Sequence, residues 1–555
     1  MYRSFAIILL FCFITGNSIF ICFAQPEPAA ESSEKYWIFF CDKKEVHFNP
    51  LTYFDPKTIA RRMKYGIPLA DSLDFPVNET YLQRVCEITG SVKITSRWLN
   101  AAVVIATKEQ INQIIAFPFV ARVEKIVSEC RLAGNRSSPD TIKIKLSDSD
   151  SILLEKQIKR MQGEKFIQKG IDGNGVRVAV FDAGFPWVNT HPAFEHIRKE
   201  NRILKTYDFV KSDEFVYDYS SHGTGVLSNI AGLMEGRHIG LATGAEFLLA
   251  RTEQAAGEPF SEEENWVAAI EWADKNGADM VSSSLGYTYH RYFPEQMDGK
   301  TTYISRAANI AARKGLLVIN AAGNDGSGRW KKLGAPADAD SIVTVGGFNP
   351  GSDYHINFSS YGPTADMRRK PNVAAYGSAI IAGKNGLEHA FGTSFATPLV
   401  TGFTACAWQT KRDLNNMEMF RELEKSGHLY PYFDYAHGYG IPQASYFTDS
   451  VFSPPDTTFT MSINTPFVTI LVKKMASDTV TDTVQIVAGL IESLLTKSFR
   501  KNLLFYHIEN DKGYLDKYFV VDITGRDEYV IDVGDVKPGY ILRVHNKGYT
   551  EVYKF

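Results

Sequence analysis

The chain has 555 residues, and its 60 Lys and Arg against 63 Asp and Glu give a formal net charge of −3. One hydrophobic core does not extend over such a length, so about two to four domains are expected. The balanced charge, without a long block of one sign, argues against nucleic acid or an anionic membrane surface as a partner.

The first residues, 1–24, form a candidate export signal. A short basic start precedes an apolar run at residues 5–14, and the small residue Ala24 stands at the expected cleavage point. A retained membrane anchor is the rival interpretation, but the polar residues 15–18 leave the run short for a bilayer. The pattern predicts a secretory signal peptide, and therefore a secreted or cell-surface protein with no membrane span after signal removal.

The six cysteines do not suggest a disulfide framework. Cys12 and Cys22 lie in the signal and neither follows a small residue, which disfavours a lipoprotein, while the last two thirds of the chain contain Cys406 alone. No C-x-x-C motif or His/Cys cluster predicts a zinc site, so stability is expected to come from packing.

Residues 25–130 predict a small α/β domain. It has candidate strands at residues 35–43 and 92–107 and a candidate helix at residues 108–123, but no catalytic constellation. Residues 131–165 are polar and rich in turn formers, which is the composition of an exposed linker. Such a segment is a natural cleavage site.

From residue 166 to residue 449, short Val/Ile/Leu/Ala runs alternate with helical patterns. Strands that are apolar on both faces and alternate with helices predict a doubly wound α/β domain, whose mostly parallel sheet is covered on both sides. In such sheets functional groups gather at the carboxyl ends of the strands. The expected strands are residues 176–182, 245–252, 280–286, 316–324 and 341–347, and the expected helices are residues 222–234, 264–277 and 303–315.

Residues 450–555 change to strand-like runs separated by Gly-containing turns, which predicts a β-sandwich domain of about a hundred residues. The runs are residues 502–510, 517–524, 528–535, 539–546 and 549–555. A substrate- or surface-binding module and a secretion tail are both compatible with this pattern.

Three polar residues of the α/β region stand at the ends of predicted elements: Asp182, His222 and Ser394. A serine nucleophile needs an imidazole to take its proton and a carboxylate to hold the tautomer of that imidazole. Ser394 would begin a helix, where backbone N–H groups can donate to a developing oxyanion; Gly392 permits the turn, and Pro398 falls early in the helix. Each residue alone also has an ordinary interpretation as a helix cap, strand end or turn residue.

The blocks around these residues resemble those of subtilisin-like serine proteases over roughly residues 166–449. VAVFDAGF, SSHGTGVLSNIAG, SSSLGY, INAAGNDG and GTSFATPLVTG follow one another in the family's order. The resemblance implies a subtilisin-type fold in which Asp182 orients the imidazole and His222 is general base and then acid. It further implies that Ser394 forms the acyl-enzyme and that Asn324, otherwise a plain turn residue, donates to the oxyanion.

The resemblance also implies where a substrate binds. Ser284, Leu285 and Gly286 resemble the edge strand that pairs with an extended substrate backbone. Gly334 resembles the floor of the pocket for the P1 side chain, where it leaves room for a large residue.

Two positions depart from the family's blocks. In KPNVAAYG, Asn372 and Tyr376 stand where an acidic residue and a proline are usual, and a structural role is expected for both. The implied chemistry needs no cofactor and no metal ligand is assigned. Structural calcium stays open, because the family's calcium sites are not legible and SDSDS at residues 147–151 lacks the spacing and glycine of an EF-hand loop.

The N-terminal domain is similar, in position and pattern, to the inhibitory propeptides of secreted subtilisins. The alternative is a permanent N-terminal domain. The resemblance implies a zymogen that acts on protein or peptide substrates, with the maturation site in residues 131–165 and the propeptide as an intramolecular inhibitor.

Two other classes of function compete with a protease. A catalytically silent binding protein of the same fold would be expected to have lost a site residue, yet all four implied residues are present. The glycines at 323, 326 and 328 suggest a nucleotide-binding enzyme as another alternative. Their spacing, however, is G-x-x-G-x-G and not the G-x-G-x-x-G of a dinucleotide-binding loop. The sequence therefore favours a secreted serine endopeptidase made as a self-processing zymogen.

Overall fold

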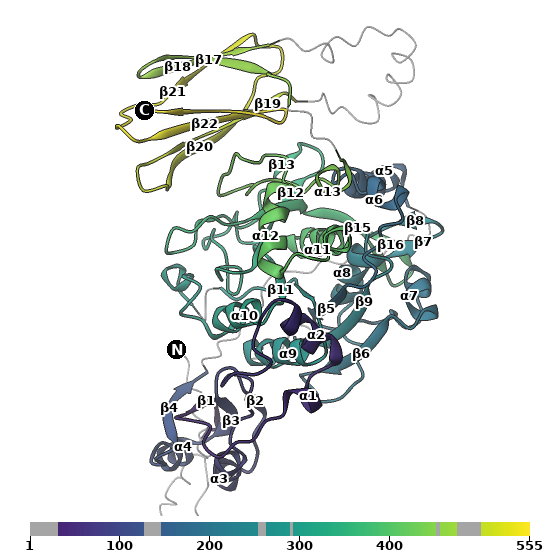
Figure 1. Cartoon of the computed structure of the whole chain (residues 1–555), viewed down its shortest axis with the longest axis vertical. Coiled ribbons are helices and arrows are strands. Elements are labelled where there is room, and N and C mark those ends of the chain that lie inside the picture. Colours follow the sequence, from purple (N-terminus) through teal and green to yellow (C-terminus); the bar gives the residue numbers. More distant parts are fainter. Residues whose placement is uncertain (1–31, 127–145, 254–261, 289–291, 451–454, 474–500) are drawn as a thin grey trace, which may run out of the picture.

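The computed structural model describes residues 32–126, 146–253, 262–288, 292–450, 455–473 and 501–555. Three parts follow one another along the long axis: the N-terminal domain at the bottom of Figure 1, the large α/β domain in the middle and the C-terminal strands at the top. The predicted signal peptide and the first half of the predicted linker, up to residue 145, lie outside the described residues.

The N-terminal domain contains a four-stranded antiparallel sheet in the order β2-β3-β1-β4. Side chains alternate between the two faces of a strand. In β1, Ile38 and Phe40 pack under helices α3 and α4, whereas Trp37 and Phe39 pack against the α/β domain. The elements are β1 (Glu34–Phe40), α1 (Pro50–Tyr53), α2 (Pro56–Lys64), α3 (Glu79–Thr89), β2 (Ile94–Ser96), β3 (Ala101–Ala106), α4 (Lys108–Ile115) and β4 (Val120–Lys125).

The helix predicted over residues 108–123 is too long. A capping box between Thr107 and Gln110 begins α4, but the helix ends at Ile115 and its predicted second half contains β4. Pro118 accounts for the break, because proline disfavours helical backbone at the residue before it.

Between β1 and α3 the chain leaves the N-terminal sheet and runs along the α/β domain (Figure 1), a segment outside the predicted elements. Asn49 and Asp55 cap α1 and α2 by accepting hydrogen bonds from the amides of Leu51 (3.0 Å) and Lys57 (2.8 Å). A proline follows each cap at the first helical position. These Asn-Pro and Asp-Pro pairs are helix-start signals that the sequence contains.

The prediction of a linker over residues 131–165 is wrong for the second half of that range, where two helices form. They are α5 (Asp148–Lys159) and the start of α6 (Glu164–Gln168). Leu154 and Ile158 are buried in the core of the α/β domain. Ser147 begins α5 by accepting a hydrogen bond from the Asp150 amide (3.2 Å), so the acidic SDSDS stretch is a helix start.

The α/β domain is built on a sheet in the order β13-β12-β11-β10-β5-β9-β6, with β14 beside β12. Every pairing in it is parallel except that of β12 with β13. Val180 and Ile319 point into the core shared with α8 and α11, whereas Ala179 and Val318 point into the core shared with α9 and α10. The sheet is therefore covered on both faces, which explains its continuous apolar strands.

The elements of this domain follow the predicted alternation of strand and helix. They are β5 (Arg177–Asp182), α7 (Glu195–Lys199), β6 (Ile203–Asp208), α8 (His222–Ala231), β7 (Leu233–Met234), β8 (Arg237–His238), β9 (Glu246–Arg251), α9 (Glu263–Lys275), β10 (Met280–Ser283), α10 (Tyr303–Arg313), β11 (Leu317–Ala321), β12 (Val343–Asn349), β13 (Tyr354–His355), β14 (Val373–Tyr376), β15 (Ser378–Gly383), β16 (Gly386–Phe391), α11 (Thr393–Thr410), α12 (Asn416–Lys425) and α13 (Ser445–Thr448).

The C-terminal region consists of two antiparallel sheets around one core. The sheets have the orders β17-β18-β21 and β20-β19-β22-β23, and the shared core includes Ile470, Ile531, Leu504 and Leu542. Five strands fall on the predicted runs, and the hairpin of β17 and β18 was outside them. The strands are β17 (Phe459–Asn464), β18 (Phe467–Val472), β19 (Leu503–Glu509), β20 (Leu515–Asp522), β21 (Glu528–Asp532), β22 (Ile541–Asn546) and β23 (Tyr549–Lys554).

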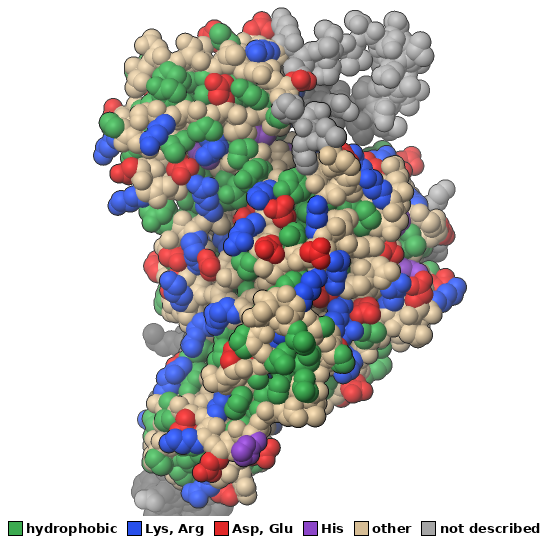
Figure 2. Space-filling model, viewed as in Figure 1, with side chains coloured by type: hydrophobic (Ala, Val, Ile, Leu, Met, Phe, Trp, Pro, Cys, Tyr) green, Lys and Arg blue, Asp and Glu red, His purple; other side chains and the backbone are tan. Residues whose placement is uncertain are grey.

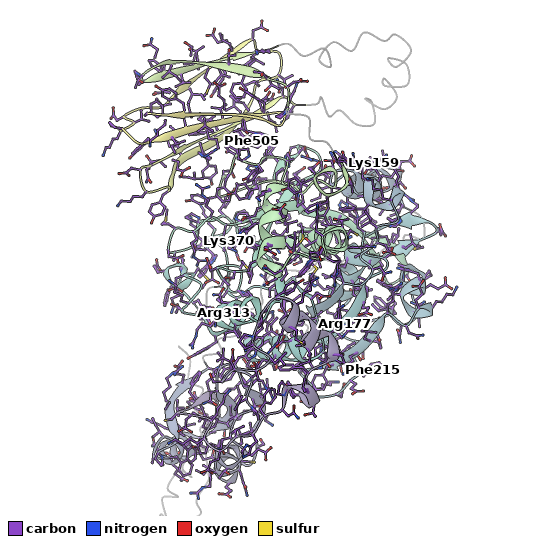
Figure 3. All side chains as sticks on the ribbon, in the orientation of Figure 1. Lys159, Arg177, Phe215, Arg313, Lys370 and Phe505 are labelled. Atoms are coloured by element: carbon purple, nitrogen blue, oxygen red, sulfur yellow. The ribbon has the colours of Figure 1, made fainter. Side chains whose placement is uncertain are left out.

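Strand β19 also attaches this region to the α/β domain. Phe505 lies at the base of the C-terminal sheets in Figure 3 and belongs to the same core as the residues of α8 and α11. Tyr432 of the α/β domain packs on it at a ring-centroid distance of 5.7 Å.

The described surface carries basic and acidic side chains interspersed over the face shown in Figure 2. Within the described ranges, no helix is both long and apolar enough to cross a membrane. Cys41, Cys86 and Cys406 are free thiols.

Candidate active site

Asp182 and His222 form a hydrogen-bonded pair at the carboxyl end of the central sheet. Asp182 is the last residue of β5 and is fully buried, and its Oδ1 accepts a hydrogen bond from the Ala183 amide (2.8 Å). His222 Nδ1 lies 2.9 Å from both carboxylate oxygens. A carboxylate only accepts, so Nδ1 carries the proton and Nε2 is left as the base.

A glycine directly after His222 makes this pairing sterically possible. A Cβ on Gly223 would stand 2.3 Å from the carbonyl oxygen of Gly184 and 2.9 Å from Cβ of Asp182. The first turn of α8 can therefore approach the end of β5 closely only because this position has no side chain.

Ser394 is the second residue of α11, and its side chain is tied to Ser284. The Ser394 hydroxyl donates to the carbonyl oxygen of Ser284 (3.2 Å), and the Ser284 hydroxyl donates to the carbonyl oxygen of Ser394 (2.9 Å). The second bond is available because the helical donor for that carbonyl would come from residue 398, which is proline and has no N–H. Among the described residues, no hydrogen bond joins Ser394 to His222 in this conformation.

Asn324 and the start of α11 surround one small space beside the Ser394 side chain. Asn324 Oδ1 accepts hydrogen bonds from the amide and the hydroxyl of Thr393 (2.9 and 3.0 Å), which leaves its Nδ2 as a donor. A Cβ on Gly392 would lie 3.4 Å from Asn324 Nδ2 and 3.6 Å from the Ser394 amide nitrogen. The nitrogen atoms of two N–H donors thus lie within 3.6 Å of one point, and Gly392, at φ 144°, keeps that point free of a side chain.

Thr393 was not among the predicted site residues. It orients Asn324 through both its amide and its hydroxyl. Its position between Gly392 and Ser394 in the GTS block is the signal that could have identified it.

The predicted substrate edge lies beside Ser394. Leu285 is buried and its carbonyl oxygen accepts from Asn320 Nδ2 (3.0 Å), whereas Gly286 is exposed and an added Cβ there would meet no atom within 4 Å. Tyr287 pairs with Ala335 through two antiparallel backbone hydrogen bonds (2.8 and 3.0 Å), which places Gly334 opposite Thr288, just after the 284–286 segment.

The two departures from the family's blocks are engaged elsewhere. Asn372 accepts from the Thr344 amide (2.9 Å) and donates to Glu424 (2.8 Å), and the Tyr376 hydroxyl donates to Asp353 (3.3 Å). Neither side chain contributes to the geometry around Ser394.

A buried aspartate that holds a histidine, beside a serine at a helix N-terminus, is the constellation of a serine hydrolase. Comparison with known families specifies the class further. The chain contains a peptidase S8 domain of the subtilase family, whose model matches residues 173–440, and the model of the Bacteroidota peptidase S8 propeptide domain matches residues 35–141.

Curated relatives are serine proteases of bacilli and related bacteria. Subtilisin Savinase of Lederbergia lenta is 28% identical over 273 residues, which is 48% of this chain and 89% of that protein. M-protease of Shouchella clausii (strain KSM-K16) is 28% identical over the same share of this chain, and the thermophilic serine proteinase of Bacillus sp. (strain AK1) is 31% identical over 46% of it. The aligned segments span 63% and 56% of these two relatives, less than two thirds of their length.

Solved structures that are similar to this one include the crystal structure of MycP1 from Mycobacterium smegmatis. It is 21% identical, with a TM-score of 0.42 over 54% of this chain and 85% of that one.

Proposed function

We propose that this protein is a secreted serine endopeptidase, made as a zymogen, that hydrolyses peptide bonds through Asp182, His222 and Ser394. The observation that carries the proposal is the 2.9 Å contact of His222 Nδ1 with the buried Asp182, beside the start of α11, where Phe395, the residue after Ser394, packs on the His222 ring at a centroid distance of 5.4 Å. The parallel sheet with helices on both faces supports a doubly wound domain of subtilisin type, and the two-sheet C-terminal region supports a β-sandwich.

The first chemical step needs a small rearrangement of Ser394. Its hydroxyl turns from the Ser284 carbonyl towards His222 Nε2, which takes the proton as the oxygen attacks the substrate carbonyl. Asp182 stabilises the imidazolium that forms, and its hold on Nδ1 keeps the ring in the productive tautomer. His222 then gives the proton to the leaving amine.

The oxyanion of the tetrahedral intermediate is stabilised by Asn324 Nδ2 and the Ser394 amide. The nitrogens of both donors already lie within 3.6 Å of one point, and donors that are in place before charge develops stabilise it without a cost of reorganisation. Water, activated by His222, then hydrolyses the acyl-enzyme. The residues of this chain complete the cycle, and the proposal assigns no cofactor or metal ligand.

The substrate binds in extended form. Ser284, Leu285 and Gly286 supply a strand edge for its backbone, and Gly334 borders the pocket for the P1 side chain. The hydrogen bond from the Ser284 hydroxyl to the Ser394 carbonyl oxygen is retained when the Ser394 hydroxyl turns, so it joins this edge to the start of α11 throughout the reaction.

The N-terminal domain is the propeptide and an intramolecular inhibitor. The support is its family match at residues 35–141 and the shared core in which Trp37 and Phe39 contact α9 and α10. The maturation cut falls between this domain and α5, and the candidate signal at residues 1–24 directs export.

A fluorophosphonate probe tests the function directly. Purified protein is expected to be labelled at Ser394, as mapped by mass spectrometry, and Ser394→Ala is expected to lose both labelling and N-terminal processing. Ser327→Ala, at an exposed serine near the site, is the control and should label normally. A folded, processed protein that resists the probe would contradict the proposal and favour a binding protein of the same fold.

A further inference from the structure

Helix α2 of the N-terminal domain places two adjacent arginines inside the molecule. Arg62 is fully buried and Arg61 is 4% exposed, although arginine is almost never buried unless it is paired. The helix lies at the amino-terminal ends of the strands of the central sheet, whereas the active site lies at their carboxyl ends. Its N-cap residue, Asp55, pairs with Arg177 at the start of β5 (3.2 Å). Asp182 stands at the other end of that strand.

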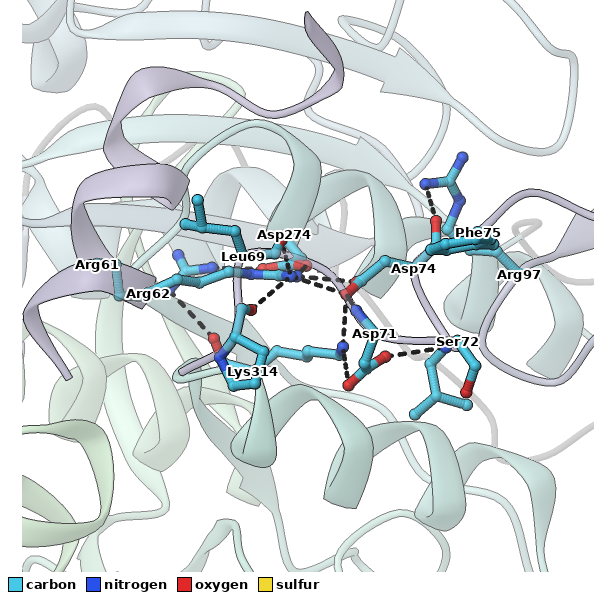
Figure 4. A network of polar contacts seen from close by, with 12 residues as sticks. Arg61, Arg62, Leu69, Asp71, Ser72, Asp74, Phe75, Arg97, Asp274 and Lys314 are labelled. Atoms are coloured by element: carbon cyan, nitrogen blue, oxygen red, sulfur yellow. Dashed lines mark hydrogen bonds and ion pairs between the residues drawn. The ribbon is translucent and has the colours of Figure 1, made fainter. Parts of the chain in front are cut away.

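The arginines belong to a network of six charges that crosses between the two domains (Figure 4). The N-terminal domain contributes Arg61, Arg62, Asp71 and Asp74, and the α/β domain contributes Asp274 of α9 and Lys314 directly after α10. The contacts are Arg62 with Asp74 (2.8 and 3.0 Å) and with Asp274 (2.7 Å), Lys314 with Asp71 and Asp74 (2.7 Å each), and Arg61 with Asp274. Three cations meet three carboxylates, so the network is neutral.

Each charge that the α/β domain contributes has its partners in the N-terminal domain. Asp274 contacts both arginines, and Lys314 contacts the two aspartates. This surface of the α/β domain thus presents one negative group, Asp274, and one positive group, Lys314. It favours a segment that supplies a cation to Asp274 and a carboxylate to Lys314.

The same helix satisfies backbone groups at the ends of α9 and α10. The last carbonyls of a helix have no donor within it, and cations are favourable there. Arg61 donates to the carbonyl oxygens of Ala278 and Lys314, Thr58 donates to that of Asp274, and the Asp55 amide donates to that of Lys275 (2.8 Å).

We propose that the C-terminal ends of α9 and α10, with Asp274 and Lys314, are a second docking site for the propeptide, remote from the active site. Its occupant is the α2 anchor, defined as Arg61 and Arg62 with Asp71 and Asp74. The anchor determines how long the propeptide stays bound after the chain is cut. The inference rests on the proposed function insofar as the N-terminal domain is an inhibitory propeptide.

The energetics make this site selective for a complete anchor. Removal of one member of a buried ion network leaves the others desolvated and unpaired, which is strongly unfavourable. Departure of the whole propeptide instead returns Asp274 and Lys314 to water, so the free catalytic domain incurs no such penalty.

The test uses the full chain with Ser394→Ala and a site-specific protease sequence inserted between residues 135 and 140. After cleavage and dilution, release of the N-terminal fragment is followed by size-exclusion chromatography. Arg62→Met, which retains most of the apolar stem, and Asp274→Asn are each expected to accelerate release by about a hundredfold or more. The double variant is expected to be much less than additive.

Arg84→Ala is the matched control, because Arg84 is an exposed arginine of the same domain whose ion pair is with Glu87 of its own helix. It should release its propeptide at the parent rate. Thermal unfolding of each uncut chain establishes that it is folded. The proposal is wrong if Arg62→Met and Asp274→Asn both release at the parent rate, or if Arg84→Ala accelerates release equally. Since release is measured without Ser394, a failure here leaves the protease function untouched, and a failure of probe labelling leaves the anchor untouched.

Discussion

At the scale of single residues, two side chains of the candidate site each have two polar atoms. One of these atoms forms a hydrogen bond that fixes the orientation of the side chain, and the other is left for a substrate. Asn324 uses its side-chain oxygen to accept from Thr393, which leaves its amide group to donate at the proposed oxyanion site. His222 likewise uses Nδ1 for Asp182 and keeps Nε2 for chemistry. Orientation of this kind keeps the donors in place before charge develops, which is where most of their catalytic effect originates.

Asn324→Ala is expected to lower kcat by about a hundredfold to a thousandfold with little change in KM, because the lost hydrogen bond forms mainly in the transition state. The measurement is steady-state hydrolysis of a peptide substrate by the matured enzyme. Thr393→Val keeps the backbone donor to Asn324 and should lose less activity than Asn324→Ala. An unchanged kcat with a raised KM would show that Asn324 contributes to ground-state binding instead.

At the scale of elements, the N-terminus of α11 is joined to the proposed substrate edge at residues 284–286 because Pro398 leaves one helical carbonyl without a donor. Ser284 supplies the missing hydrogen bond from a segment more than a hundred residues away in the chain. The backbone hydrogen bond that Pro398 removes from the helix is thus replaced by a bond that connects two parts of the candidate site.

Ser284→Ala is expected to lower the free energy of unfolding by about 1 kcal/mol, since it leaves the Ser394 carbonyl without its donor. In a Ser284→Ala/Pro398→Ala chain, residue 398 regains an N–H and should recover most of this loss. Urea unfolding of the single and double variants, each in the Ser394→Ala background, measures the effect. Equal stability of the parent and Ser284→Ala would contradict it.

Helix α9 carries a carboxyl group whose titration depends on the propeptide. Glu271 accepts hydrogen bonds from the Ser96 hydroxyl (2.5 Å) and from the amides of Arg97 (3.0 Å) and Trp98 (3.2 Å). Burial raises the pKa of Glu271 to about 7, although these three hydrogen bonds lower it. We therefore expect the complex to hold a proton below a pH of about 7 that the separated catalytic domain, in which Glu271 would regain an ordinary pKa, releases.

The sign of the pH effect follows from this raised pKa. Propeptide binding is strongest below the ordinary value near 4.5 and weakens as the pH rises through about 7, with a total change of up to about a hundredfold. Dissociation of the linker-cut Ser394→Ala chain between pH 5 and pH 8 measures it. Glu271→Gln should flatten the dependence, and affinity that is constant or increases with pH in the parent would show that Glu271 stays ionised.

At the scale of the whole molecule, buried histidines stand where the C-terminal region meets the α/β domain. His507 Nδ1 contacts the carbonyl oxygen of Phe433 (2.5 Å), and its ring stacks on Tyr432 at 5.1 Å. Burial lowers the pKa of His507 to about 3 and the pKa values of His355 and His545 to about 4. All three are therefore neutral in the folded molecule at neutral pH.

Acid is expected to destabilise this interface. A histidine with a depressed folded pKa contributes stability above its unfolded value of about 6.5, and that stability is lost as the pH falls towards 4 and 3. The free energy of unfolding should therefore fall by several kcal/mol in total between pH 6.5 and pH 4, and the melting temperature should drop steeply with it. His507→Gln should reduce the slope in calorimetric scans and the exposed His47→Gln should not; identical slopes would exclude His507 as a source of the effect.

Much of the fold could be predicted because its signals are local. The apolar runs of β5, β10 and β11 and the helical patterns of α9 and α10 lie within single segments, so no distant contact is needed to recognise them. The candidate site residues Asp182, His222 and Ser394 also stand at the ends of such runs, but the resemblance of the surrounding blocks to those of subtilisin-like proteases singled them out. The helix cap at Ser147 is an equally local signal, but it was missed. The polar composition of residues 147–151 suggested a linker and not the start of α5.

The sequence by itself therefore determined most strands and helices of the α/β domain and the family that its blocks resemble, and it supplied Asp182, His222 and Ser394 as candidate reacting groups. Only the tertiary structure decided which groups meet: that Ser284 bonds to the Ser394 carbonyl, and that Arg61 and Arg62 are buried against Asp274. The stretch KTIARRMK reads alone as an exposed basic helix. Its burial depends on carboxylates and carbonyls that lie more than two hundred residues away, and no local propensity encodes such a partner.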